Sequence, residues 1–502
     1  MSQPKNNSLE IPLGKRTLSY RFFEMLPALL SFGAIILLIV LSLTNPLLAA
    51  AFLLLVVLTT FVKALGIAIR TIQGYSKLHK AQKVNWQHRL EDISYLQKKE
   101  SLPEVDTTEW KSNIHMQNLQ RIEKSIKDYP KASDIYNAVI IATYNEGPET
   151  LEPTIRSVIN TSFPAKKTIL VLAYEERGGQ KTEQTVRDLK TRYGSEFFAF
   201  ELVKHPKNMP NELVGKGGNI TYAGHFLENW LEKKKIATSN VIVTTLDSDN
   251  RPAKEYFSIV TYEYIVHPNR HRLSFQPISL FLNNIWDVPA PMRVIATGNS
   301  FWNIICSVRP HTLRNFASHS QGMQALKEMN FWSVRTIVED GHQYWRSYFF
   351  FKGNYNVIPI YIPIYQDAVL SNTYAKTLKA QFIQLRRWAY GASDVPYVAT
   401  RVFTRKRTVP FISGVTHFFR LLDSHVTLAS TPLLVAFGGW VPLFLNNDAA
   451  RSIIAHELPE IVSQVQRIAL IGIFITVFLT FKMLPPRPER YKRHRSVFML
   501  LQ

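Results

Sequence analysis

Three short polar motifs in this 502-residue chain combine residue types that can act together on a phosphorylated substrate. They are, in chain order, Asp247-Ser248-Asp249, Glu339-Asp340 and Gln384-x-x-Arg387-Trp388. Each motif alone occurs by chance in many chains, so the inference depends on their order and on the elements that carry them. Together the carboxylates, the arginine and the aromatic ring indicate group transfer from a diphosphate-bearing donor.

The first motif places two carboxylates at the end of a predicted strand. Asp247 and Asp249 are two residues apart, so their side chains share a face of the strand. Carboxylates are hard oxygen ligands that hold Mg²⁺ or Mn²⁺ against phosphate oxygens, so one of the two aspartates can ligate the metal while the other reaches the metal or a ribose. A lone Asp-x-Asp is more often a capped surface turn, but its position after the fourth strand of an α/β pattern favours a metal site.

The second motif offers a candidate general base. Transfer of a sugar with inversion requires a group that takes the proton of the acceptor hydroxyl, and a carboxylate opposite the leaving group can do this. Asp340 is our candidate base, with Glu339 beside it. Alternatively, the acidic pair caps a helix that opens at Gly341, where negative charge suits the helix dipole. Spacing alone favours neither interpretation.

The third motif presents its side chains on one helix face, because Gln384, Arg387 and Trp388 stand at i, i+3 and i+4. Arg387 can bind a departing diphosphate through two hydrogen bonds, and Trp388 can provide an aromatic platform for an acceptor sugar. The same pattern is typical of an amphipathic helix at a membrane interface. Both interpretations can hold together.

Four β-rich runs separated by helical segments follow Pro130, at residues 137–143, 168–174, 198–203 and 240–246. Near-continuous apolar strands alternating with helices predict a mostly parallel, Rossmann-like α/β sheet covered on both faces. We expect irregular, membrane-facing structure over residues 273–365 because prolines interrupt the apolar runs, and an amphipathic helix over 376–390. Residues 72–129 read as a connector along the membrane surface.

Ligands bind at the carboxyl ends of the strands in such sheets, and polar residues follow the strands here. They include Thr143-Tyr144-Asn145-Glu146 after the first run and Glu175-Glu176 after the second. A Lys216-Gly217-Gly218 turn opens the helix before the fourth strand, where backbone amides and a lysine can approach phosphate, although a basic turn with two glycines is usually only a turn. These edges can together bind a nucleotide.

Four apolar segments are long enough to cross a membrane, at residues 25–44, 47–69, 426–445 and 461–481. Basic residues gather before the first, after the second and after the fourth segment, so the positive-inside rule places both termini and the central region in the cytoplasm. The apolar residues 497–501 could begin a fifth helix.

The formal net charge of +21 fits attraction to anionic lipid and a phosphate-bearing substrate better than nucleic acid, because no nucleic-acid module is visible. The single Cys306 excludes an intramolecular disulfide.

These motifs resemble those of the membrane-embedded inverting glycosyltransferases of family 2, which include the processive cellulose, hyaluronan and chitin synthases. The resemblance spans about residues 137–391 and the flanking helices, and its most specific part is Gln384-x-x-Arg387-Trp388. It implies a GT-A catalytic domain facing the cytoplasm of a bacterial-type inner or plasma membrane, with a UDP-sugar donor, a glycan or lipid acceptor and Mg²⁺ or Mn²⁺.

The resemblance also implies roles for individual residues. Nucleotide-sugar contacts fall on Thr143, Asn145, Glu146, Glu175, Lys216 and Asp247. Metal ligation falls on Asp249 with Asp247, catalysis on Asp340 with Glu339, and the diphosphate and acceptor platform on Gln384, Arg387 and Trp388.

We therefore expect an N-terminal transmembrane hairpin (1–71), an interfacial connector (72–133), a GT-A domain with interfacial helices (134–400) and a C-terminal transmembrane region (401–502). The expected function is an inverting transferase that builds and exports a polysaccharide. Two alternatives stay open at this point: a non-processive transferase that glycosylates a lipid carrier, and a membrane-tethered basic scaffold without catalysis.

Overall fold

A computed structural model describes residues 9–99, 101–446, 453–492, 494 and 499, and the chain divides into two compact units. The first, here called the sheet unit, contains residues 9–11, 74–387 and the described residues from 484 onward. The second, the helical unit, contains residues 12–73 and the described residues of 388–483. Each is described by itself below.

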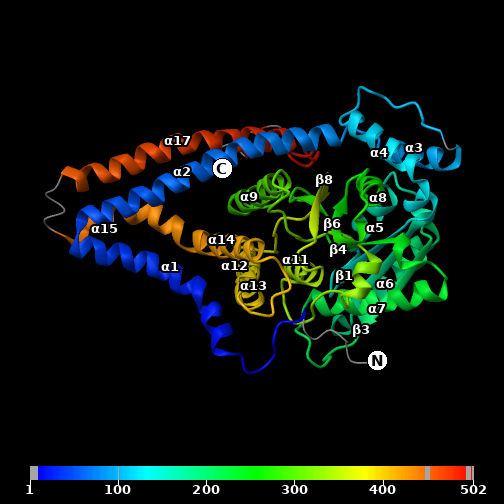
Figure 1. The fold of residues 1–502 in the computed structure, drawn as a ribbon, viewed down its shortest axis with the longest axis horizontal. Helices are drawn as coiled ribbons and strands as arrows, with labels where there is room; N and C mark the ends of the chain where they lie inside the picture. Colours follow the sequence, from blue (N-terminus) through cyan, green and yellow to red (C-terminus); the bar gives the residue numbers. More distant parts are fainter. Residues whose placement is uncertain (1–8, 100, 447–452, 493, 495–498, 500–502) are drawn as a thin grey trace. The chain divides into compact units, whose positions relative to one another are not determined.

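The sheet unit is built on eight strands in the order β3-β2-β1-β4-β7-β6-β8-β5. Figure 1 labels β1, β3, β4, β6 and β8 among them. The strands are β1 (Tyr136–Thr143), β2 (Thr168–Glu175), β3 (Ala199–His205), β4 (Val241–Asp247), β5 (Arg251–Pro252), β6 (Leu273–Leu280), β7 (Ser320–Gly322) and β8 (Asn356–Tyr365). Strands β1 to β4 pair in parallel, as do β6 and β8, whereas the short β7 and β5 run antiparallel to their neighbours. The predicted mostly parallel sheet is confirmed, and the four predicted strands match β1 to β4 to within one or two residues.

Helices cover both faces of this sheet. They include α5 (Pro148–Ile159), α6 (Gly179–Tyr193), α7 (Lys216–Lys233) and α8 (Tyr256–Val266). On one face Ile220 and Leu227 of α7 belong to the same buried cluster as Ile140 of β1 and Val171 of β2. On the other face the Asn137 amide donates a 2.8 Å hydrogen bond to the Thr261 hydroxyl of α8. Alternate residues of each strand thus meet different helices, so continuous apolar runs are buried on both sides.

The expectation of irregular structure over residues 273–365 is wrong. That region forms β6, α9 (Ala290–Ser307), β7, α10 (Met323–Glu328), α11 (Glu339–Phe350) and β8. Prolines lie inside both long strands, and the pairing of β6 with β8 shifts register between Pro277 and Ile278. A proline donates no hydrogen bond to the ladder, and a local irregularity accommodates it. The strands therefore persist where the sequence pattern indicates breaks.

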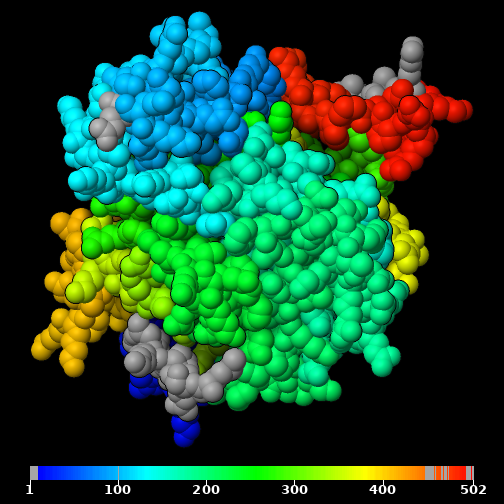
Figure 2. Space-filling view, turned by 90° about the vertical axis from the view of Figure 1, so that its right-hand side faces the viewer, coloured from blue at the N-terminus to red at the C-terminus, as the bar shows by residue number. Residues whose placement is uncertain are grey.

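The connector forms two helices, α3 (Trp86–Lys99) and α4 (Ser112–Lys124), which pack against α8. The hydroxyl of Tyr262 on α8 lies 2.9 Å from Nδ1 of His115 and accepts a 3.0 Å hydrogen bond from the Asn118 amide. Figure 2 shows this part of the chain in light blue beside the green surface of the sheet unit. These helices thus form part of the sheet unit; their predicted contact with a membrane stays a prediction.

Within the described residues, three helical stretches are long and apolar enough to cross a membrane. They are α1 (Leu18–Thr44), α2 (Pro46–Ala81) and the stretch Phe411–Leu445, which contains α14 (Phe411–Phe437) and α15 (Val441–Leu445). These match three predicted crossings. The fourth lies within α17 (Ile453–Met483), where Phe474–Met483 is a shorter apolar helix. The possible fifth helix lies almost wholly outside the described residues.

The charged residue that interrupts the second predicted crossing has an acidic partner within the helical unit. Lys63 of α2 extends its Nζ to within 3.1 Å of Asp423 Oδ2 on α14. Charged residues in apolar helices are costly unless they pair or reach a polar surface. The pair explains how α2 carries a lysine inside its apolar stretch.

Replacing Ile140 with alanine tests the assigned core. Ile140 is fully buried in the cluster beneath α7, so the change should lower the free energy of unfolding by roughly 2–5 kcal/mol. Thermal or denaturant unfolding of the detergent-solubilised protein measures the loss. Ile114→Ala on α4, where the side chain is exposed, is the matched control and should change stability little. Equal effects of the two changes would contradict the assigned core.

Candidate active site

Several predicted polar residues lie at the carboxyl ends of the parallel strands, next to β1, where the direction of the crossover connections reverses. Strand β1 lies between β2 and β4, so the crossovers leave it in opposite directions. Thr143 ends β1 and Asp247 ends β4, with Ala142 and Asp247 in register. This is the kind of position at which open α/β sheets bind ligands.

The ammonium group of Lys216 lies at the centre of this edge. Its Nζ is 2.9 Å from Asp247 Oδ1 and 3.1 Å from Asp340 Oδ2, and 3.9 Å from Glu339 Oε1. Lys216 begins α7, Asp247 ends β4, and the acidic pair forms the first turn of α11. Three of the predicted motifs, separated by up to 124 positions, therefore meet on one cation.

The charges in this cluster stabilise one another. Burial disfavours the ammonium form of Lys216, but the charges of the two nearest carboxylates, Asp247 and Asp340, raise the pKa of the lysine. Burial would also favour a neutral Asp247, yet the neighbouring Lys216 and the charge of Arg387 lower the pKa of that aspartate. The two groups are therefore a charged pair at neutral pH.

The two acidic residues of α11 differ in environment. The Glu339 side chain is only 5 % exposed, and burial together with the charge of Asp340 raises the pKa of Glu339 to about 8. The Asp340 side chain is 18 % exposed. Asp340 is thus the member of the pair better placed to meet an incoming hydroxyl, while Glu339 holds a proton at neutral pH.

A buried histidine lies behind Asp340. His319 Nδ1 is 3.0 Å from the Phe316 carbonyl oxygen and 3.9 Å from Asp340 Oδ1, and the Trp332 indole donates to its Nε2 at 3.5 Å. Burial lowers the pKa of His319, so the ring is neutral and its Nδ1 carries the proton toward Phe316. The sequence shows no metal-ligand spacing around this histidine, which lies in the loop directly before β7.

Asp249 belongs to a second carboxylate group at the same edge. Its Oδ2 accepts a 3.1 Å hydrogen bond from the backbone amide of Asp367, and the Asn283 amide donates to its carbonyl oxygen at 3.0 Å. Burial and the charges of Asp247 and Asp367 raise the pKa of Asp249 to about 7. Asp367 follows β8. The sequence pattern did not predict this strand, and for that reason it did not indicate Asp367 as a site residue.

The donor set of the first motif suits a cation that shares its coordination with a substrate. The described residues contain no group of three His, Cys, Asp or Glu side chains able to hold a metal ion by themselves. Mg²⁺ commonly takes one or two carboxylates and completes its shell with water and substrate phosphates. Asp247 and Asp249 fit this requirement, since a cation between them would relieve the crowding of negative charge.

The loop after β1 is shaped by Glu146. One oxygen of this carboxylate accepts hydrogen bonds from the Thr143 hydroxyl at 2.7 Å and from the backbone amides of Tyr144 at 2.7 Å and Asn145 at 3.2 Å. Glu146 therefore fixes the turn, and the side chains of Tyr144 and Asn145 are exposed to solvent. Nucleotide contacts by Thr143, Asn145 and Glu146 stay predictions.

Glu175 lies in a buried ionic network beside the α7 turn. Its Oε2 is 2.9 Å from Arg177 Nη2 and 3.2 Å from His205 Nδ1, and His205 Nε2 is 3.1 Å from Glu212. Burial opposes charge on His205, but its two carboxylate partners raise the pKa of the imidazole to about 9. A Cβ added to Gly218 would lie 2.7 Å from Glu212, so the glycine allows this close approach. Its position after β2 predicted Glu175 as a site residue, whereas no sequence pattern predicted its network with His205 and Glu212.

The third motif lies on α12 (Tyr374–Ala389) and crosses the boundary between the two units. Gln384 accepts a 3.0 Å hydrogen bond from Gln381, and Arg387 is the last residue of the sheet unit, close enough for its charge to lower the pKa of Asp247. Trp388 belongs to the helical unit. The helix also exposes Phe382 and Leu385, which fits the predicted interfacial face. The roles of Gln384, Arg387 and Trp388 stay predictions.

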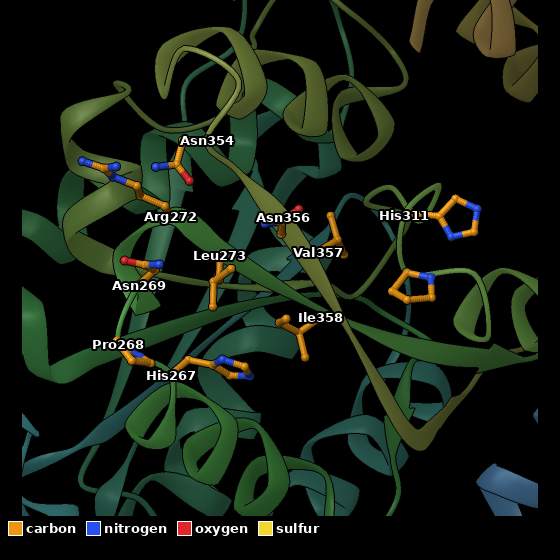
Figure 3. Close-up of a pocket in the computed structure, with 11 residues that line it drawn as sticks. His267, Pro268, Asn269, Arg272, Leu273, His311, Asn354, Asn356, Val357 and Ile358 are labelled. Atoms are coloured by element: carbon orange, nitrogen blue, oxygen red, sulfur yellow. The ribbon is translucent and has the colours of Figure 1, made fainter. Parts of the chain in front are cut away.

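A separate cavity of about 340 Å³ lies at the opposite edge of the sheet (Figure 3). Its lining includes Leu273 and Asn356, the first residues of β6 and β8, together with Arg272 and His311. The Lys216 cluster is at the carboxyl ends of the parallel strands, whereas this cavity is at their amino ends. The cavity is therefore not part of the candidate active site.

No protein-family model and no curated protein sequence matches this chain. Solved structures with some similarity include the mannosyltransferase PcManGT from Pyrobaculum calidifontis in complex with GDP-Man and Mn²⁺, with 14 % identity and a TM-score of 0.41 over 78 % of this chain and 96 % of that one. S. aureus TarS 1–349 in complex with UDP-GlcNAc has 10 % identity and a TM-score of 0.36 over 67 % of this chain and 90 % of that one. TarS 1–349 alone has 13 % identity and a TM-score of 0.32, with coverages of 66 % and 91 %.

The network around His205 predicts a pH-dependent stability. The imidazole pKa is about 9 in the folded chain and 6.5 as its ordinary value, so its contribution is complete below about 6.5 and is lost as pH rises through about 9. We expect the melting temperature of wild type to exceed that of His205→Gln by the largest margin at or below pH 6.5, and the margin to shrink between pH 7 and pH 9.5. An exposed control, His79→Gln, should follow wild type at every pH. A constant margin from pH 6 to pH 10 would contradict the assigned network.

Proposed function

We propose that this chain is an inverting glycosyltransferase that uses a nucleotide-sugar donor at a membrane. The observation that carries the proposal is the meeting of Asp247 and Asp340 on Lys216, at 2.9 and 3.1 Å. Through Lys216, the proposed nucleotide contact Asp247 at the end of β4 lies close to the proposed base Asp340 on α11. One bound substrate would then contact both residues. A scaffold protein does not require this arrangement of buried charge.

The donor diphosphate would lie across the carboxyl end of β4. Asp249 with Asp247 would hold Mg²⁺ or Mn²⁺, which when bound neutralises phosphate charge. The cationic side chains of Lys216 and Arg387 provide positive charge on the same side, where it stabilises the leaving diphosphate. Thr143, Asn145, Glu146 and Glu175 are proposed to shape the nucleotide pocket.

The transfer step requires a base on the side opposite the diphosphate. The acceptor oxygen attacks the anomeric carbon, the bond from that carbon to the phosphate oxygen breaks, and the hydroxyl proton passes to Asp340. Glu339 is protonated at neutral pH and cannot take a second proton, so this role falls to Asp340. Inversion follows because a single displacement places the new bond on the opposite face.

The finer assignments rest on the resemblance of the motifs to the family 2 enzymes. They are a UDP-linked sugar, a polysaccharide product that is exported, a catalytic domain over residues 134–400 on the cytoplasmic side, and an acceptor platform at Gln384, Arg387 and Trp388. The apolar stretches α1, α2 and Phe411–Leu445 support a location in the membrane.

Nucleotide release by the detergent-purified full chain with Mn²⁺ tests the proposal. The donors are UDP-glucose, UDP-N-acetylglucosamine, UDP-galactose, UDP-glucuronate and GDP-mannose, the last because a similar structure contains it. We expect one donor to be consumed, and Asp340→Asn to reduce turnover by about 100-fold or more because the base is lost. Release by Asp340→Asn at the wild-type rate would contradict the assigned base.

The product separates the remaining interpretations. A chain that grows without dissociating gives long glycans, whereas a single sugar extractable into organic solvent would identify transfer to a lipid carrier. No turnover with any donor, together with wild-type behaviour of Asp340→Asn in cells, would favour the non-catalytic scaffold.

Lys216→Met tests the central cation separately from the base. The change removes the positive charge next to Asp247 and Asp340, so we expect turnover to fall by on the order of 100-fold and donor affinity to weaken. Nucleotide binding measured by calorimetry distinguishes it from Asp340→Asn, which should keep its affinity. Lys233→Gln at the exposed opposite end of α7 is the control. Normal donor binding by Lys216→Met would contradict a phosphate-side role.

A further inference from the structure

A short segment near the start of the chain lies inside the sheet unit although the helices that follow it belong to the helical unit. Residues 9–11 group with the sheet unit, whereas residues 12–73 do not. Leu9 and Ile11 are buried, and the Glu10 side chain is only 9 % exposed. We call Leu9, Glu10 and Ile11 the strap.

The strap pairs with a buried arginine of the catalytic region. Arg346 of α11 is 1 % exposed, and its Nη1 forms an ion pair with Glu10 Oε1 and donates to the Leu9 carbonyl at 3.3 Å. A guanidinium cannot lose its proton in a protein, so it requires a partner when buried. Glu10 supplies that partner from a position 336 residues away.

The same arginine holds a strained loop. Its Nη2 donates to the carbonyl oxygens of Met329 at 2.9 Å and Phe331 at 3.2 Å. Asn330 and Phe331 both have positive φ angles, 57° and 58°, in a backbone conformation that residues other than glycine rarely adopt. The two hydrogen bonds fix the carbonyls on either side of this strained pair, so the loop from 329 to 338 depends on Arg346.

The loop from 329 to 338 in turn packs against the α7 turn. Ser333 donates its hydroxyl to Glu10 Oε2 at 2.6 Å, and a Cβ added to Gly217 would lie 2.4 Å from the Ser333 carbonyl oxygen. The Leu213 amide donates to the Val334 carbonyl at 2.8 Å. The loop thus contacts the chain on both sides of Lys216 and leads directly into Glu339.

We propose that Glu10 is a positioning residue for the active site. Its carboxylate bridges Arg346 and Ser333, and thereby sets the distance between Lys216 on α7 and Asp340 on α11. It touches no substrate, so its effect is on the geometry of the reacting groups. This inference rests on the proposed function of the Lys216 cluster.

Glu10→Gln in the full chain tests the proposal, with Glu123→Gln on the exposed surface of α4 as the matched control. We expect Glu10→Gln to lower kcat with the preferred donor by on the order of 10- to 100-fold, because small displacements of reacting groups have effects of this size. KM for the donor should change less than about threefold, since ground-state binding is not removed. Glu10→Asp should recover part of the rate.

Hydrogen–deuterium exchange gives a readout that does not require activity. In Glu10→Gln, exchange should accelerate over residues 329–346 and stay unchanged over 136–175.

The outcomes are distinct. If wild type consumes no donor, the proposed function fails, and the exchange pattern still decides the role of Glu10. If Glu10→Gln matches Glu123→Gln in both rate and exchange, Glu10 positions nothing. A uniform rise in exchange across all strands would also overturn the proposal, because it would mean that the strap only supports folding in general.

Discussion

The candidate site depends on the charge of Lys216, which lies between carboxylates from two other elements. A buried ammonium is stable only where negative charges outweigh its lost hydration, and here Asp247 and Asp340 approach it within 3.1 Å. The contact requires α7, β4 and α11 to be in place together. The close packing at Gly217 is part of the same requirement, because a Cβ at this position would lie 2.4 Å from the backbone carbonyl oxygen of Ser333.

The other carboxylates at this edge crowd one another. Asp249 lies beside Asp367, and Glu339 beside Asp340, and in each case burial and a like charge raise a pKa. Such groups are unfavourable in an isolated protein and become favourable when a cation or proton is shared among them. The crowding of Asp249 with Asp367 and of Glu339 with Asp340 therefore suits a site that a bound cation or proton would stabilise.

Sequence patterns predicted the parts of the fold that depend on local chemistry. The apolar runs of β1 to β4 identified the strands, and four residues predicted from their types and spacing lie close together in the structure: Lys216, Asp247, Glu339 and Asp340. Strands β6 and β8 were not predicted, because prolines interrupt their apolar pattern and the register shift that accommodates proline leaves no periodic signal. Asp367, which follows β8, was therefore not predicted either. Partners that come together only through tertiary folding, such as His205 with Glu212 and Glu10 with Arg346, left no pattern to read.

The pairing of Glu10 with Arg346 sets an order of events during synthesis. The strap leaves the ribosome first, yet its partner follows 336 positions later, which at about 5–20 residues per second is a delay of roughly 17–70 s. During that interval α1 and α2 are already available for insertion into a membrane, while Glu10 has no arginine to bind. The cluster around Lys216 therefore reaches its final geometry only after α11 has been made, long after the apolar stretches α1 and α2 are complete.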